Sequence, residues 1–223
     1  METKKKLLLG FFILLSCVHV ATRIAAINLI ADLTKSLLIP ALFILVWVET
    51  KPQNKYLIAL FFSWLGDLFL IGEGTLFFVL GVAAFWCTQL LYIHLLLKEF
   101  EKDFWKRANR NKTIIPFLFF GSYLTVVLAS ILPQLGLLKP IVTLYAITLC
   151  VSGFLGVTLW NTIRDAQSTK LAIGIFLFVL SDSMIAFDAF YFEVPYFTYW
   201  IMLTYIPAQY LISRFLAFSL KNS

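Results

Sequence analysis

The fold is decided by a run of large apolar residues that carries a single acid: Phe61–Ile71, FFSWLGDLFLI, with Asp67 inside it. A carboxylate at the centre of a bilayer costs about 2.5 to 3.5 kcal/mol even on the mildest insertion scales. A chain this apolar could have placed a leucine there. We therefore interpret Asp67 as a functional residue, and its partners must come from other spans of the chain.

The composition is that of an integral membrane protein. Of the 223 residues, 61% are hydrophobic and 13% are charged, whereas soluble domains are about 45–50% apolar and about 25% charged. The net charge of +6 does not indicate a nucleic-acid partner, because the basic residues lie in short segments between apolar runs. We expect one membrane domain over residues 1–223. The cysteines lie inside apolar runs, so we expect no disulfide and no metal site.

Eight apolar segments approach the length of about 20 residues that a spanning helix needs, which predicts an all-α bundle of about eight transmembrane helices. The basic start and the apolar run after it resemble a signal peptide, but the run continues to Ile30 and favours a retained first helix. The second segment is the shortest and contains Pro40, which predicts a kink. The segments are residues 7–27, 33–48, 55–72, 75–97, 113–132, 138–160, 170–190 and 196–218.

The distribution of Lys and Arg predicts that both termini are cytoplasmic. The charged run from Lys98 to Lys112 is then a solvated cytoplasmic loop. On the opposite side the basic residues are few: Arg23, Lys35 and Lys139. The predicted cytoplasmic set is Lys4, Lys5, Lys6, Lys51, Lys55, Lys98, Lys102, Lys106, Arg107, Arg110, Lys112, Arg164, Lys170 and Lys221, with Arg214 near that face.

This orientation places two acids, Asp67 and Asp182, in the outer half of the bundle. Other polar residues fall in the same layer or near it, which predicts a polar cavity if they face one another. His19 and Arg23 lie near the outer end of the first span. The candidate supporting residues are Lys35, Gln89, Tyr145, Ser181, Tyr205 and Gln209.

A weak internal repeat supports the pairing of the two acids. Phe61–Asp67 reads FFSWLGD and Phe176–Asp182 reads FLFVLSD, and each is followed by a span that contains Gln. A 4+4 arrangement of parallel repeats would bring the acids together across a pseudo-two-fold axis, as in transporter halves.

Two carboxylates in one cavity of low dielectric constant do not both ionise cheaply, so the pair tends to hold one proton. It then supplies a general acid and a general base near neutral pH. Lys35 or Arg23 is suited to neutralise the remaining charge or to hold a lipid phosphate. Structural interpretations of the same residues stay open. The two acids would then only pack between helices, Lys35 would extend to the lipid headgroups, and the tyrosines would be ordinary aromatic residues of the bundle. His19 would be a hydrogen-bonded core residue.

The motifs together resemble the YhhN family of eight-span membrane proteins, whose characterised members are lysoplasmalogenases. The matching pieces are, in chain order, Phe62–Asp67, Phe78–Gly81 with Phe85, Leu91-Tyr92, Pro140 with Tyr145, Gly174–Phe178 with Ser181-Asp182, and Leu203–Tyr205 with Ala208-Gln209.

The resemblance implies hydrolysis of the vinyl-ether bond of a lysoplasmalogen, which releases a fatty aldehyde and a glycerophospho-base. The family's two acids fall on Asp67 and Asp182, and no metal or other cofactor is implied. The expected partners are a lysophospholipid or ether-lipid substrate and the membrane lipids. The chain departs from the family at Lys35-Ser36, where Lys-Pro is frequent, and at Gln89, where His is frequent.

Three other functions stay open on the residues alone. A small transporter or proton-coupled carrier would also use intramembrane acids in a duplicated bundle. An intramembrane aspartyl protease is less favoured, because Trp64-Leu65-Gly66-Asp67 lacks the first glycine of the GxGD motif of that class. A lipid-binding protein without catalysis is the third.

Overall fold

The computed structural model describes residues 2–50, 52–100, 110–191 and 197–219, and in these residues every regular element is a helix. The helices belong to two compact units, Met1–Thr88 with Ala217–Ser223, and Gln89–Leu216. The middle of the predicted cytoplasmic loop, residues 192–196, and Lys51 and Lys221 lie outside the described residues.

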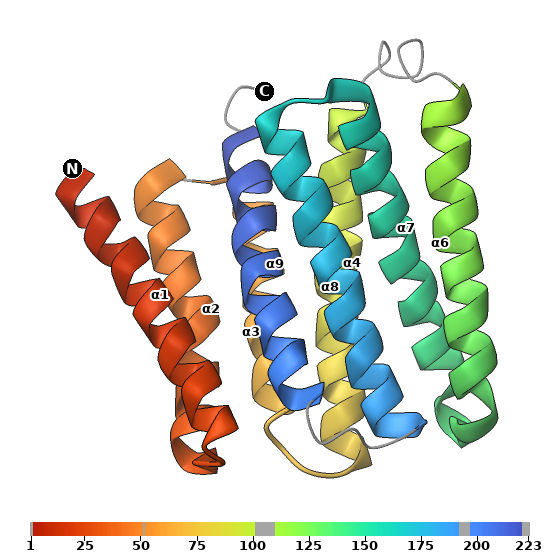
Figure 1. Cartoon of the computed structure of the whole chain (residues 1–223), viewed down its shortest axis with the longest axis horizontal. Helices are drawn as coiled ribbons and strands as arrows, with labels where there is room; N and C mark the ends of the chain where they lie inside the picture. The colour runs from red at the N-terminus through yellow and green to blue at the C-terminus, as the bar shows by residue number, and fades with distance from the viewer. Residues whose placement is uncertain (1, 51, 101–109, 192–196, 220–223) are drawn as a thin grey trace. The chain divides into compact units, whose positions relative to one another are not determined.

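The first unit contains α1 (Glu2–Ile24), α2 (Asn28–Thr50), α3 (Asn54–Phe69) and the first part of α4 (Thr75–Glu99). Helices α1 and α2 pack along each other as a hairpin (Figure 1). Gly66 lets α3 approach α4 closely: a Cβ atom at Gly66 would lie 2.6 Å from the Phe85 ring. The residue before Asp67 is therefore small because an aromatic ring takes the place of its side chain.

The predicted second span was too short, since α2 begins at Asn28 rather than at residue 33 and has 23 residues. Asp32, in the extra first turns of α2, is accommodated because the Arg23 Nη2 atom lies 2.5 Å from its Oδ1 atom. Lys35 is thus in the second turn of the helix and not at its start. Pro40 lies inside α2 and does not end it.

Three prolines, Pro40, Pro116 and Pro207, lie inside described helices and remove a backbone donor, and at the first two a side chain from a neighbouring helix replaces it. Pro40 has no N–H for the carbonyl of Ser36, and the Trp64 indole N–H of α3 donates to that carbonyl at 2.9 Å. Pro116 likewise has no N–H for the carbonyl of Lys112, and the Asn161 side chain of α7 donates to that carbonyl at 3.4 Å. Inside a bilayer the Ser36 carbonyl has no water to bind, so the Trp64 side chain makes Pro40 tolerable there.

The second unit contains α4 from Gln89, α6 (Arg110–Ile131), two short 3₁₀ turns, α7 (Lys139–Ile163), α8 (Ala166–Phe190) and α9 (Phe197–Ser219) up to Leu216. Helix α7 packs against both α6 and α8 (Figure 1). Gly174 brings α8 against the backbone of α9, because a Cβ atom there would lie 3.0 Å from the Ile212 nitrogen. The 3₁₀ segments Leu132–Gln134 and Gly136–Leu138 connect α6 to α7.

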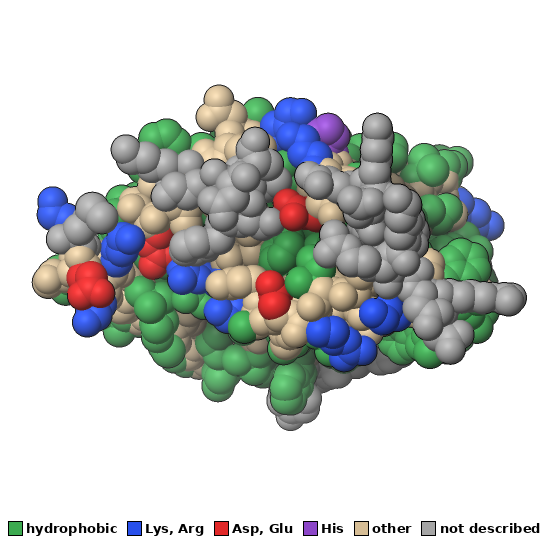
Figure 2. All heavy atoms as spheres, turned by 90° about the horizontal axis from the view of Figure 1, so that it is seen from above, with side chains coloured by type: hydrophobic (Ala, Val, Ile, Leu, Met, Phe, Trp, Pro, Cys, Tyr) green, Lys and Arg blue, Asp and Glu red, His purple; other side chains and the backbone are tan. Residues whose placement is uncertain are grey.

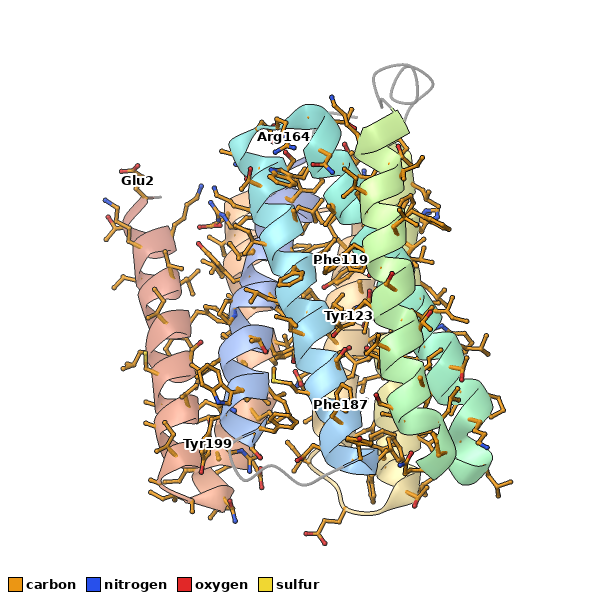
Figure 3. The ribbon with its side chains drawn as sticks, turned by 45° about the vertical axis from the view of Figure 1, so that its right-hand side comes forward. Glu2, Phe119, Tyr123, Arg164, Phe187 and Tyr199 are labelled. Atoms are coloured by element: carbon orange, nitrogen blue, oxygen red, sulfur yellow. The ribbon has the colours of Figure 1, made fainter. Side chains whose placement is uncertain are left out.

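The turn between α7 and α8 is tightly built. Arg164 ends α7 with φ of 59°, and its guanidinium carbon lies 4.0 Å from the centroid of the Trp160 ring. Figure 3 marks Arg164 at this turn. The Asp165 carboxylate accepts from the Ser168 N–H at 2.7 Å and caps α8. These donors hold the pKa of Asp165 below its usual value, since they stabilise the ionised form.

Six of the described helical segments are long and apolar enough to cross a membrane: α1, α2, α4, residues 112–134, residues 136–163 and α8. Helix α3 has 16 residues, and α9 has 23 residues but is not among the six. The count of eight spans and the sidedness of the termini therefore stay predictions.

The surface of the described helices is apolar, as lipid-facing helices require. Phe11 and Trp47 are exposed in the first unit, and Ile115, Phe117 and Val126 in the second. Lys and Arg instead gather at helix ends, for example Lys98 in the last turn of α4 and Arg23 in the last turn of α1. Figure 2 looks onto one end of the helices and shows Lys and Arg side chains (blue) spread over its described part.

Candidate active site

Asp182 lies buried on α8, with 6% of its surface exposed. The hydroxyl of Tyr145 on α7 donates to its Oδ2 atom. The sequence predicted both residues, and the structure brings them into direct contact. Because an uncompensated acid in an apolar bundle is costly, this phenol offsets part of the cost of burying Asp182.

A third helix reaches the same place through a residue that sequence reasoning missed. The Tyr123 hydroxyl of α6 donates to the Ser183 Oγ atom at 2.8 Å, and Ser183 follows Asp182 on α8. Figure 3 shows Tyr123 on α6 with Phe119 one turn away, and the two rings are stacked with centroids 6.4 Å apart. We call Tyr123, Tyr145, Asp182 and Ser183 the Asp182 cluster.

Ser181 does not point its hydroxyl to a catalytic partner in this cluster. Its Oγ atom donates to the backbone carbonyl of Ile201 on α9 at 3.3 Å. Ser181, a candidate supporting residue, therefore joins α8 to α9.

Tyr205 and Gln209 form a second polar group with Tyr92 of α4. The Gln209 amide nitrogen donates to the Tyr205 hydroxyl at 3.2 Å, and the Tyr92 hydroxyl donates to the Gln209 Oε1 atom at 2.9 Å. Phe178 packs edge-on against both tyrosine rings. All three polar residues are at most 3% exposed. The two candidates Tyr205 and Gln209 thus contact each other, and Tyr92 extends the group.

Gln89, where this chain departs from the motif pattern that it resembles, is also buried and paired. The Ser152 hydroxyl of α7 donates to its Oε1 atom at 2.8 Å, and 1% of Gln89 is exposed. An amide is stable in this place because one neighbour supplies the donor that its oxygen needs. It does not exchange a proton as histidine would.

Asp67 belongs to the first unit, on α3, and is 2% exposed. The Lys35 ammonium of α2 interacts electrostatically with it. Lys35 is 7% exposed, so the interpretation in which it snorkels to headgroups is wrong. The predicted combination of Asp67 with a cation is present within this unit, and the pairing of Asp67 with Asp182 stays a prediction.

His19 and Arg23 of α1 have structural partners on α2. The His19 Nδ1 atom lies 3.0 Å from the Ala31 carbonyl and 3.0 Å from the Thr34 hydroxyl, and the ring is fully buried. Arg23 binds Asp32. These contacts hold the α1–α2 hairpin together and place His19 in the core with its Nδ1 atom satisfied, whereas its Nε2 atom is buried without a hydrogen-bond partner among the described residues.

Two of the missed residues carried a sequence signal. Tyr92 stands in the Leu91-Tyr92 motif, and Ser183 adjoins Asp182. Tyr123 and Ser152 carried none, because a hydroxyl in an apolar helix faces lipid as often as a neighbour until the helix rotation is known. Among the described residues, no group of three or more His, Cys, Asp or Glu side chains is arranged to hold a metal ion.

The profile of the YhhN family matches residues 30–216, a range that contains both acids and every supporting candidate. The chain belongs to the YhhN family. The motif resemblance is thereby confirmed, and the chain is an integral, multi-pass membrane protein.

Two curated relatives of this YhhN chain are similar over most of its length. Lysoplasmalogenase TMEM86A of Bos taurus is 31% identical over 175 residues, which span 74% of this chain and 66% of the relative. Lysoplasmalogenase TMEM86B of Homo sapiens is 31% identical over 208 residues, which span 91% of this chain and 83% of the relative. No solved structure matches the chain significantly.

Proposed function

We propose that this YhhN chain hydrolyses the vinyl-ether bond of a lysoplasmalogen or a related lysolipid within the membrane. The observation that carries the proposal is Asp182, a buried carboxyl group held by the Tyr145 hydroxyl in an apolar helix bundle. Both relatives named above are lysoplasmalogenases. A vinyl ether is acid-labile, so a buried acid is the group that its hydrolysis needs.

In this mechanism Asp182 is the general acid. Tyr145 engages the Oδ2 atom, so the proton that is transferred resides on Oδ1. The proton goes to the β-carbon of the vinyl ether, and the electron pair of the double bond forms the new C–H bond. The α-carbon and the ether oxygen then share the positive charge of an oxocarbenium ion.

Asp67 is the carboxylate of the mechanism, with Lys35 as its counter-charge. It stabilises the oxocarbenium ion and takes a proton from the water that attacks the α-carbon. The product is a hemiacetal, which collapses to a fatty aldehyde as the glycerol oxygen leaves with a proton. Water is consumed, no electrons are exchanged, and the two acids end in exchanged protonation states.

This role for Asp67 requires that both acids reach one substrate. A cross-linking experiment tests the requirement: Cys17, Cys87 and Cys150 are changed to serine, and Asp67 and Asp182 are changed to cysteine. A short bis-maleimide reagent is expected to join the two cysteines in the folded protein in detergent, detected by mass spectrometry of the linked peptides. A pair of Asp67→Cys and Glu99→Cys serves as the control. Linkage of the control pair alone would contradict the two-acid mechanism.

The activity is tested by aldehyde release from lysoplasmalogen by the purified full chain in detergent. The reaction is run in D₂O, where the mechanism predicts one deuterium on the carbon next to the aldehyde group. Asp182→Asn and Asp67→Asn are compared with the native chain. Failure of the native chain to release aldehyde, together with substrate flux into liposomes that contain it, would favour the carrier instead.

A further inference from the structure

An apolar groove lies in the second unit between α4, α6 and α7. Its volume is about 370 Å³, and it is lined by eleven residues whose side chains are apolar apart from the thiol of Cys150. Phe117 forms part of its edge and is 64% exposed, so the groove opens sideways on the lipid-facing surface. Phe154 opposes Phe117 edge-on across it, with ring centroids 6.2 Å apart.

One end of the groove adjoins the Asp182 cluster. Leu124 lines the groove and directly follows Tyr123, which donates to Ser183. Cys150 also lines it and interacts electrostatically with Tyr123. From this end the groove extends along the helices towards Leu97, near the last turn of α4.

A hydrocarbon chain fits these walls better than any polar ligand does. Water in the groove would find almost no hydrogen-bond partners, whereas lipid chains reach its open side directly from the bilayer. The volume of about 370 Å³ leaves room for a segment of hydrocarbon chain. A single groove with one polar end suits a lipid with one chain and one headgroup.

We propose that this groove is the subsite for the hydrocarbon chain of the lysolipid substrate and that it selects chain length. The chain lies between α4, α6 and α7, and its first carbons reach the Asp182 cluster. This inference rests on the proposed function, because it assigns the groove to the substrate rather than to a lipid of the surrounding bilayer.

Gly121 offers a direct way to fill the groove. It lines the groove on α6, and a Cβ atom built there meets no atom within 4 Å. Leucine is also a better helix former than glycine, so Gly121→Leu is expected to fold. Gly10→Leu on α1 is the matched control, because Gly10 also has no atom within 4 Å of its Cβ position and belongs to the first unit.

The first readout is aldehyde release from lysoplasmalogens of increasing chain length. Gly121→Leu is expected to lower kcat/KM about ten- to hundredfold for long chains, the range that one mismatched group in an apolar pocket produces. Short chains are expected to keep their native kcat/KM. Gly10→Leu is expected to match the native chain at every length. An unchanged length profile in Gly121→Leu would overturn the proposal.

The second readout does not need activity. A non-hydrolysable alkyl lysolipid with a photoreactive group on its chain is expected to label groove residues of α4, α6 and α7 in the native chain and to lose this labelling in Gly121→Leu. Unlabelled lysolipid is expected to compete. Labelling that a two-chain phospholipid removes equally well would assign the groove to bilayer lipid and contradict the proposal. If lysolipid competes for the labelling but the native chain releases no aldehyde, the groove is a lysolipid site and the proposed hydrolase function is refuted.

Discussion

The hydrogen bond from Trp64 to the Ser36 carbonyl offers a quantitative test of how this bundle tolerates Pro40. The N–O distance is 2.9 Å, which is close to the optimum. Hydrogen bonds inside a membrane protein contribute about 0.6 kcal/mol on average and up to ~1.7 kcal/mol. Because this acceptor has no helical donor, we expect the upper part of that range, about 1 to 1.5 kcal/mol.

Trp64→Phe is expected to lose this amount and, in addition, the packing of the indole against Phe61, whose ring centroid lies 6.0 Å away. A double-mutant cycle separates the two losses. In the Pro40→Ala background, residue 40 regains an N–H that donates to the Ser36 carbonyl. Trp64→Phe then costs only the packing, so the coupling between the two changes equals the hydrogen bond.

The assay is equilibrium unfolding of the full chain in detergent micelles, with the four proteins of the cycle measured in parallel. For a chain of this size, about 1 kcal/mol corresponds to roughly 2–4 °C in Tm. Trp47→Phe, a half-exposed tryptophan on the same helix as Pro40, is the control and is expected to show no coupling to Pro40→Ala. Equal costs of Trp64→Phe in both backgrounds would refute the reasoning.

Three further predictions follow from the site and the turns. Tyr145→Phe removes the donor to Asp182 and is expected to lower kcat about ten- to hundredfold, with a shifted pH–rate profile, while circular dichroism stays native. Gly66→Ala places a Cβ atom 2.6 Å from the Phe85 ring and is expected to cost about 1–3 kcal/mol in unfolding free energy, most of it recovered by Phe85→Leu. Asp165→Ala removes the α8 cap and is expected to cost about 1 kcal/mol at pH 7. Since the folded pKa of Asp165 is lowered, its contribution is full above the unfolded value near ~3.9 and is lost as pH falls through the folded pKa, so the native chain and Asp165→Ala are expected to converge in acid.

Much of the fold follows from hydropathy, because a spanning helix must be apolar over its length. The start of α2 could not be predicted from hydropathy, because an acid such as Asp32 is typical of a helix boundary when its partner is unknown. That partner, Arg23, lies on the previous helix and is reached through a turn in which Ala26 adopts a φ of 56°. Because Asp32 is paired with Arg23 of the neighbouring helix, it lies inside α2 rather than at its boundary.

The candidate site was predictable where a polar residue stands in an apolar run, as with Asp67, Asp182 and Gln209. The hydrogen-bond partners of these polar residues could not be predicted as well. Each residue turns a helix face by 100°, so whether Ser152 meets Gln89 or lipid depends on helix rotations that no single sequence specifies. Tyr145 was named because it falls in the same layer as the acids and in a matching motif, and the structure places its hydroxyl on Asp182.

The account depends most on Asp182 as the acid that protonates the substrate. The most direct measurement is the rate of aldehyde release by Asp182→Asn, with Tyr145 intact, relative to the native chain on the same lysoplasmalogen. Loss of a general acid lowers the rate by about 10²–10⁴-fold, and we predict a loss in this range with substrate binding retained. Aldehyde release by Asp182→Asn at the native rate would contradict the account.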